Sequence, residues 1–178
     1  MSAPIDNTFI RDLEMKNGEQ IKIHQLEVGD VGCVVWDAAL VMCRYIETGD
    51  FDGGNSWRGL DVVEVGAGTG VLGVYAAAYG ANVTVTDLPE FLPLMNLNID
   101  TNRHHITGTA VAESLKWGEE SLGRTVDCVL MADCIYYDKL MLEKFDVEDI
   151  PLERQDSLFR SEDILIKRFW KKTFTEVG

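Results

Sequence analysis

The feature of the sequence that most constrains the fold is a short apolar segment that runs directly into three alternating glycines. Residues 61–65 (DVVEV) have the β-branched composition of a buried strand, and Gly66, Gly68 and Gly70 follow at once. Residues 71–79 are apolar and alanine-rich, which indicates a helix. Because glycine lacks a Cβ and accepts positive φ, such a strand, turn and helix lets the backbone approach a ligand closely.

The elements around this turn alternate between strand and helix patterns. Residues 82–86 (NVTVT) have strand composition and end at Asp87. The other expected elements are helices over 36–47 and 92–102 and strands over 109–112 and 126–131. This alternation predicts an α/β fold with a mostly parallel sheet and helices on both faces.

The expected organisation is a single domain over residues 1–178. Residues 1–30 are predicted to be an N-terminal appendage with one short exposed strand, in which Ile21 and Ile23 face one way. Residues 49–59, which include four glycines, are predicted to be a loop. Residues 138–178 form a C-terminal part that is shorter than such a fold needs.

Composition and charge exclude several classes of protein. Hydrophobic residues make up 46% and charged residues 26%, as in ordinary globular domains. A formal net charge of -14 would repel nucleic acid and anionic membranes, so neither is expected as a partner. The sequence shows no apolar run of membrane-spanning length and no signal-peptide pattern, and we expect a cytoplasmic protein. The four cysteines have no CxxC spacing, so neither a metal site nor a disulfide is predicted.

The spacing of the glycines separates two possible ligand classes. A dinucleotide fingerprint, G-x-G-x-x-G, would need glycine where this chain has Val71, and Glu64 instead stands two residues before the first glycine. Asp87 ends the next strand, where a carboxylate can accept hydrogen bonds from both hydroxyls of a ribose. The alternative is a plain structural turn in which Asp87 only caps a helix.

Five segments in order resemble those of the seven-β-strand protein-lysine methyltransferases: 31–39 (VGCVVWDAA), 64–70 (EVGAGTG), 85–88 (VTDL), 115–118 (LKWG) and 131–137 (MADCIYY). The resemblance implies a Rossmann-like class I fold, S-adenosyl-L-methionine as cofactor and S-adenosyl-L-homocysteine as product. It also implies protein-lysine N-methylation, with an AAA ATPase like valosin-containing protein as the substrate. The cofactor-binding residues that it implies are Trp36, Glu64, Gly66, Ala67, Gly68, Gly70, Asp87, Trp117 and Ala132. From the residues alone, core side chains are the favoured interpretation of the two tryptophans, because a tryptophan on an apolar helix face is usually buried.

Asp133 and Tyr136 form a D-x-x-Y motif just after the fourth predicted strand, where ligands bind in open α/β sheets. As residues alone they could be a helix cap and a first-turn tyrosine. The resemblance implies that they are the catalytic pair. The Asp133 carboxylate could hold the substrate ammonium, and Tyr136 could add a cation–π contact. Cys134 is interpreted as a small spacer between them.

Only residues 138–178 follow Tyr137, which is too few for the remaining elements of a seven-stranded methyltransferase. Segments 140–151 and 164–170 are expected to form the closing hairpin, while the fifth strand and its flanking helices are missing. The fourth strand would then have an unpaired edge or meet the hairpin. This leaves two alternatives to the enzyme: a catalytically impaired form that binds cofactor or a partner, and a small-molecule methyltransferase.

Overall fold

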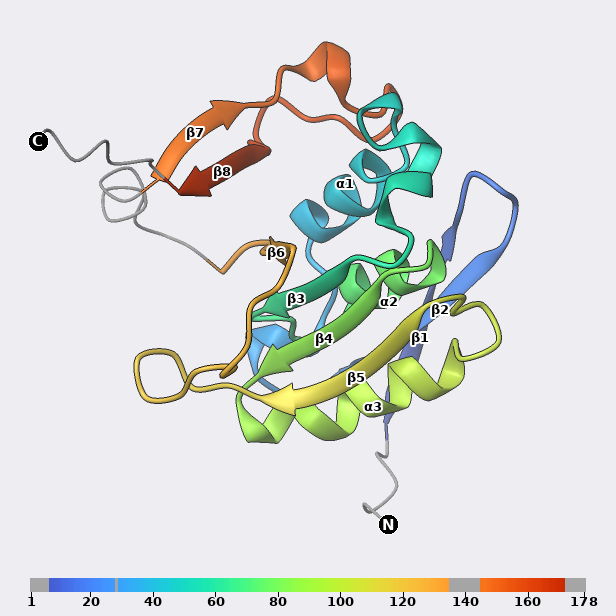
Figure 1. The fold of residues 1–178 in the computed structure, drawn as a ribbon. Coiled ribbons are helices and arrows are strands. Elements are labelled where there is room, and N and C mark those ends of the chain that lie inside the picture. Colours follow the sequence, from blue (N-terminus) through green and yellow to red (C-terminus); the bar gives the residue numbers. More distant parts are fainter. Residues whose placement is uncertain (1–6, 28, 135–144, 172–178) are drawn as a thin grey trace, which may run out of the picture.

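The computed structural model describes residues 7–27, 29–134 and 145–171. Its centre is a four-stranded sheet in the order β5-β4-β3-β6 (Figure 1). The strands are β3 (Asp61–Val65), β4 (Asn82–Asp87), β5 (Thr109–Ser114) and β6 (Cys128–Leu130). Every neighbouring pair is parallel, with Val63 opposite both Thr84 and Val129. The predicted parallel sheet is therefore confirmed, with strand bounds within a few residues of those expected.

The described residues form three α-helices on one side of this sheet, and all three were expected from the sequence. They are α1 (Asp37–Tyr45), α2 (Val71–Ala78) and α3 (Leu92–Thr101). Every residue of α2 is buried, because the helix lies between the sheet and α1. Short 3-10 segments complete this region: η1 (Val31–Cys33), η2 (Gly49–Trp57) and η3 (Pro89–Phe91). Among the described residues, no helix has the length and hydropathy to cross a membrane.

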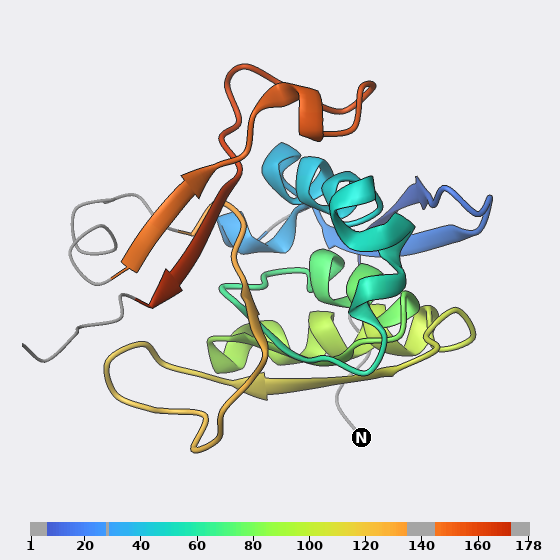
Figure 2. The same cartoon turned by 45° about the horizontal axis from the view of Figure 1, so that its top comes forward.

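The two faces of the sheet are covered differently in the described part of the chain. Glu64 faces α2, so its neighbour Val63 faces the other way, together with Thr84 and Val111 in the same register row. No described helix packs on that second face, where the 115–127 loop crosses and Arg124 donates to the Thr84 hydroxyl (Figure 2). Val111 at 49% and Val129 at 48% remain exposed there. The expected helices on both faces are thus present on one face of the described structure.

The N-terminal segment forms a hairpin of β1 (Thr8–Glu14) and β2 (Gln20–Leu26). The expected exposed strand is wrong for one of its faces, because Ile21 and Ile23 are fully buried in the main core. The alternation of apolar and polar residues had correctly separated the two faces. It could not reveal that α3 packs against β2 and covers the apolar one.

The glycine-rich stretch after α1 also differs from the predicted loop. It forms η2, which consists of 3-10 turns kinked at Asp52, Gly53 and Gly54, all with positive φ. Trp57 at its end is buried and donates its Nε1–H to the Ile46 carbonyl at 3.2 Å. The glycines permit the left-handed kinks, and the buried tryptophan holds the segment against the core.

The predicted C-terminal hairpin is confirmed as β7 (Phe145–Asp149) and β8 (Lys167–Lys171), joined through η4 (Leu152–Arg154). It forms a sheet of its own beside α1, where Ile150 and Ile166 pack against Val41 and Tyr45 (Figure 1). Among the described strands, β6 pairs only with β3. The fourth strand was expected either to have an unpaired edge or to meet the hairpin. Among the described residues, its second edge is unpaired.

Candidate active site

The glycine turn has the strained backbone that its sequence predicts. Gly66, Gly68 and Gly70 have φ of 65°, 53° and 75°, in the left-handed region that favours glycine. A Cβ on Gly68 would lie 2.5 Å from the Gly32 carbonyl oxygen, and one on Gly66 would lie 2.8 Å from the Cβ of Cys134. The packing around the turn therefore excludes side chains at both positions, and of its residues only Gly66 is partly exposed.

Asp87 fixes the turn from the end of β4. Its Oδ2 accepts the Gly68 N–H at 2.7 Å, and its Oδ1 accepts the Leu88 N–H at 2.7 Å. A carboxylate oxygen has two acceptor positions, so each oxygen keeps one for a further donor. Ala67 is held nearby through its N–H, which donates to the Thr86 carbonyl at 3.0 Å. The geometry thus fits the predicted role of Asp87 as the acceptor for two neighbouring ribose hydroxyls.

Glu64 lies beneath the turn rather than on its surface. Its side chain is buried, and Oε2 accepts the N–H of Gly73 in α2 at 2.7 Å. Burial, opposed by the Gly73 hydrogen bond and aided by the charge of Asp87, raises the pKa of Glu64 to about 8. This contact makes Glu64 a support of the turn and of the α2 N-terminus. Direct contact with a cofactor stays a prediction.

Both candidate tryptophans are surface side chains, so the core alternative is wrong. Trp36 is 50% and Trp117 is 55% exposed. Trp36 precedes α1 and donates its Nε1–H to the Val31 carbonyl at 2.9 Å, next to Gly32. The Cζ2 atom of Trp117 would be 3.3 Å from a Cβ on Gly66. Two large apolar rings therefore lie exposed beside the turn, as a site for an adenine or a sulfonium side chain requires.

The D-x-x-Y motif is described for its first half only. Asp133 is exposed just after β6 and has φ of 54°, an uncommon backbone conformation for aspartate, whereas Ala132 is half-buried against the core. Cys134 turns inward, with its Sγ 3.4 Å from the Val65 carbonyl oxygen. Burial, with the charge of Glu64 adding to it, raises the pKa of Cys134 to about 11. The thiol is thus protonated at neutral pH, which agrees with a spacer. Tyr136 lies outside the described residues.

These groups converge at the carboxyl ends of β3, β4 and β6. Gly66 contacts the region of Cys134 and Trp117, and Gly68 contacts Asp87 and Gly32. The residues present fit an S-adenosylmethionine-type ligand, since the side-chain-free turn, the acceptor positions of Asp87 and the exposed aromatic rings match its methionine, ribose and adenine parts. The structure thus brings together predicted site residues from four separate segments.

Two structural members of the site were missed at the sequence level. Gly32 packs against Gly68, and a Cβ on it would lie 2.8 Å from Cε1 of Phe91. Asn98 is fully buried and donates its Nδ2–H to the Thr69 carbonyl at 2.9 Å. The available signal was the four-residue spacing of Asn98 and Asn102, which places both on one face of the helix, where buried polar side chains need partners.

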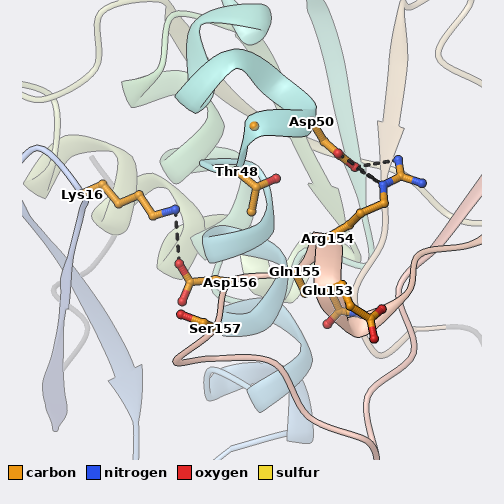
Figure 3. A pocket seen from close by; sticks show the side chains of 9 residues that line it. Lys16, Thr48, Asp50, Glu153, Arg154, Gln155, Asp156 and Ser157 are labelled. Atoms are coloured by element: carbon orange, nitrogen blue, oxygen red, sulfur yellow. Dashed lines mark hydrogen bonds and ion pairs between the residues drawn. The ribbon is translucent and has the colours of Figure 1, made fainter.

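A separate cavity of about 460 Å³ lies elsewhere, between the β1–β2 turn, the start of η2 and residues 153–157. Figure 3 shows its ion pairs, Lys16 with Asp156 at 3.2 Å and Arg154 with Asp50 at 2.7 Å. None of the candidate site residues lines it. It belongs to the contact between the C-terminal segment and the body of the protein.

Comparison with protein families covers the whole region that carries the site. The sequence model of the family described as lysine methyltransferase matches residues 15–147, which include the glycine turn, Asp87 and Asp133. The chain belongs to this lysine methyltransferase family. The expected Rossmann-like fold is confirmed, and the cofactor of the family is S-adenosyl-L-methionine, as predicted.

Individual relatives of this lysine methyltransferase chain have similar names. Protein N-lysine methyltransferase METTL21A of Mus musculus is 42% identical over 112 residues, which cover 61% of this chain and 50% of that protein. EEF1A lysine methyltransferase 3 of Xenopus tropicalis is 36% identical over 123 residues, covering 67% and 53%. The chain therefore spans about half the length of the curated relatives it matches.

Among solved structures, the chain is similar to part of the Pyrococcus abyssi tRNA (uracil-54, C5)-methyltransferase in complex with S-adenosyl-L-homocysteine. The TM-score is 0.47 at 17% sequence identity, over 67% of this chain and 27% of that one.

Proposed function

We propose that the protein is an S-adenosylmethionine-dependent protein-lysine N-methyltransferase that acts on an AAA ATPase like valosin-containing protein in the cytoplasm. The observation that carries this proposal is the placement of Asp133 beside the glycine turn. The residue after Asp133, Cys134, lies against the turn, because a Cβ added to Gly66 would be 2.8 Å from the Cβ of Cys134. The exposed Asp133 is therefore next to the cofactor turn.

S-adenosyl-L-methionine supplies an activated methyl group on a sulfonium, and transfer to an amine is an in-line displacement. The chain's own residues bind and align the reactants. Asp87 accepts from the ribose, Trp36 and Trp117 cover the apolar parts and exclude water, and the turn accommodates the methionine end. Asp133 holds the lysine ammonium on arrival. After the ammonium has released its proton to water, the neutral amine attacks the methyl group and displaces S-adenosyl-L-homocysteine, and Asp133 stabilises the positive charge on the methylated nitrogen. Tyr136 is proposed to complete this substrate site.

The substrate class is supported by the names of the relatives and by charge. Two relatives are named as lysine methyltransferases: protein N-lysine methyltransferase METTL21A and EEF1A lysine methyltransferase 3. A net charge of -14 favours a cationic side chain over a nucleic acid phosphate. The name of the second relative makes EEF1A the competitor of the ATPase as the target.

A methylation assay with labelled S-adenosylmethionine tests the proposal. The purified chain is incubated in parallel with a valosin-containing-protein-like ATPase, with EEF1A and with a metabolite extract, and products are identified by mass spectrometry. We expect a mass increase of a methyl group on a lysine of the ATPase. Methylation of EEF1A alone would replace the target, and methylated metabolites alone would overturn the protein-lysine assignment.

A cofactor-binding or partner-binding form without catalysis is the second candidate. It is favoured by the free edge of β6, which pairs only with β3 among the described strands and carries Asp133 just beyond its end. A single-turnover assay separates the two functions. Binding of S-adenosylhomocysteine by calorimetry with no methyl transfer at enzyme excess would favour this second function.

A further inference from the structure

The second edge of β2 is closed by two asparagine side chains instead of a strand. β1 pairs with one edge of β2. The carboxamides of Asn98 in α3 and of Asn102, the C-cap residue of that helix, occupy the other edge. Asn98 accepts the His24 N–H at 2.7 Å and donates to the His24 carbonyl at 3.0 Å. Asn102 accepts the Lys22 N–H at 2.8 Å and donates to the Lys22 carbonyl at 2.8 Å. Each carboxamide thus replaces the peptide group of a missing neighbouring strand.

The two asparagines differ in the use of their second amide hydrogen. Asn102 donates it to the Asn98 carbonyl at 2.7 Å, within α3. Asn98 donates it to the Thr69 carbonyl at 2.9 Å, inside the glycine turn. Both side chains are almost completely buried, so solvent cannot replace these bonds. Only Asn98 therefore joins the hairpin, α3 and the turn.

Polar side chains from three elements hold the glycine turn and the helix that follows it. Glu64 of β3 accepts the Gly73 N–H, and Asp87 of β4 accepts the Gly68 N–H. Both of these fix donors, whereas Asn98 of α3 fixes an acceptor, the Thr69 carbonyl between Gly68 and Gly70. Without Asn98 that carbonyl would lose its side-chain donor at a residue that is 2% exposed.

We propose that Asn98 is a positioning residue for cofactor binding, which rests on the proposed function of the turn. It pre-organises the Gly66–Gly70 backbone through Thr69 and transmits the position of the β1–β2 hairpin to the cofactor site. A turn that is already ordered binds its ligand more tightly, because less conformational entropy is lost on binding. Asn98 touches no reacting group and needs no contact with the cofactor.

The matched pair Asn98→Ala and Asn102→Ala tests this role. Each variant removes an equivalent pair of bonds to β2, at His24 for Asn98→Ala and at Lys22 for Asn102→Ala, so both should be destabilised by similar amounts. Only Asn98→Ala also removes the bond to the turn. We expect S-adenosylhomocysteine to bind Asn98→Ala about tenfold more weakly than Asn102→Ala by calorimetry. In the ligand-free protein, amide exchange at Gly68 and Gly70 should be faster in Asn98→Ala alone.

Each possible outcome of this comparison has a meaning. Equal affinities and equal exchange in two folded variants would overturn the positioning role. Unfolding of Asn98→Ala, and also of the milder Asn98→Ser, while Asn102→Ala stays folded would contradict the proposal, because Asn98 would then be a core residue only. A wild-type chain that does not bind S-adenosylhomocysteine would refute the proposed function instead, and the exchange measurement would still test the effect of Asn98 on the turn.

Discussion

The buried Glu64 makes the stability of this protein depend on pH in a direction opposite to that of most paired carboxylates. Its side chain lies under the glycine turn with one hydrogen bond from Gly73, and burial raises its pKa from 4.5 to about 8. In the unfolded chain the group ionises near its ordinary pKa. The folded protein therefore holds a proton that the unfolded chain releases between these two values.

The sign and size of the effect follow from this difference. A raised folded pKa gives stability that is complete below pH 4.5 and is lost as pH rises toward 8. One proton corresponds to 1.36 kcal/mol per pH unit, so the free energy of unfolding should fall by about 2.5 kcal/mol between about pH 5.5 and 7.5. The pKa of Asp50 is lowered instead, chiefly by its hydrogen bonds from Arg154. The pKa of Asp156 is also lowered, because the Leu158 N–H and Lys16 outweigh the effect of its burial. Their contribution changes only at lower pH.

Urea unfolding of the wild type and of Glu64→Gln at several pH values between about 5.5 and 7.5 measures the effect. Glutamine keeps an acceptor for the Gly73 N–H and cannot ionise. The difference in free energy of unfolding between the two proteins should therefore narrow or reverse as pH rises, while contributions common to both proteins cancel. Glu113→Gln, at an exposed position on β5, is the matched control and should leave the slope unchanged. A constant difference between wild type and Glu64→Gln at every pH would refute the assignment of a buried, proton-binding Glu64.

Two substitutions and one amide-exchange measurement probe the site further. Gly68→Ala should abolish detectable S-adenosylhomocysteine binding by calorimetry, since its Cβ would meet the Gly32 carbonyl at 2.5 Å, whereas Gly118→Ala, with similar positive φ and open space around it, should retain binding. Asp133→Ala should lower the rate of lysine methylation at least about tenfold while changing S-adenosylhomocysteine affinity little, and a lost affinity in a folded variant would place Asp133 with the cofactor instead. Amide exchange should be faster for Val129 and Leu130 than for Val62 to Val65, because β6 has one described neighbour and β3 has two; equal protection would show that the edge of β6 is covered.

The strand, turn and helix that form the predicted cofactor site could be predicted because each depends on a few consecutive residues. The β3 strand, the turn and α2 each follow from a few consecutive residues, and the positive φ of Gly66 follows from the need for glycine there. The position of Asp87 at the end of β4 follows from the parallel sheet alone. These are cases in which backbone sterics and short-range burial decide the outcome.

The missed features depend on contacts between distant segments. Alternation in β2 separated two faces, but only α3, some 75 residues later, decides that Ile21 and Ile23 are buried. The exposure of Trp36 and Trp117 likewise reflects tertiary packing, because an apolar helix face and a loop give no indication of which ring remains at the surface. The positive φ of Asp133 had no sequence signal, since aspartate is compatible with many turn conformations.

Cofactor binding and methyl transfer depend on different parts of this chain. The turn and the start of α2 are held by Glu64, Asp87 and Asn98, which all lie between β3 and α3 in the sequence and outside the C-terminal segment. Asp133 depends instead on β6, whose described pairing is three residues with β3, and on the contact of Cys134 with Val65 and Gly66. A loss of order beyond β6 would therefore reduce transfer before it reduced binding. Measuring both on one preparation separates an intact binding site from an intact enzyme.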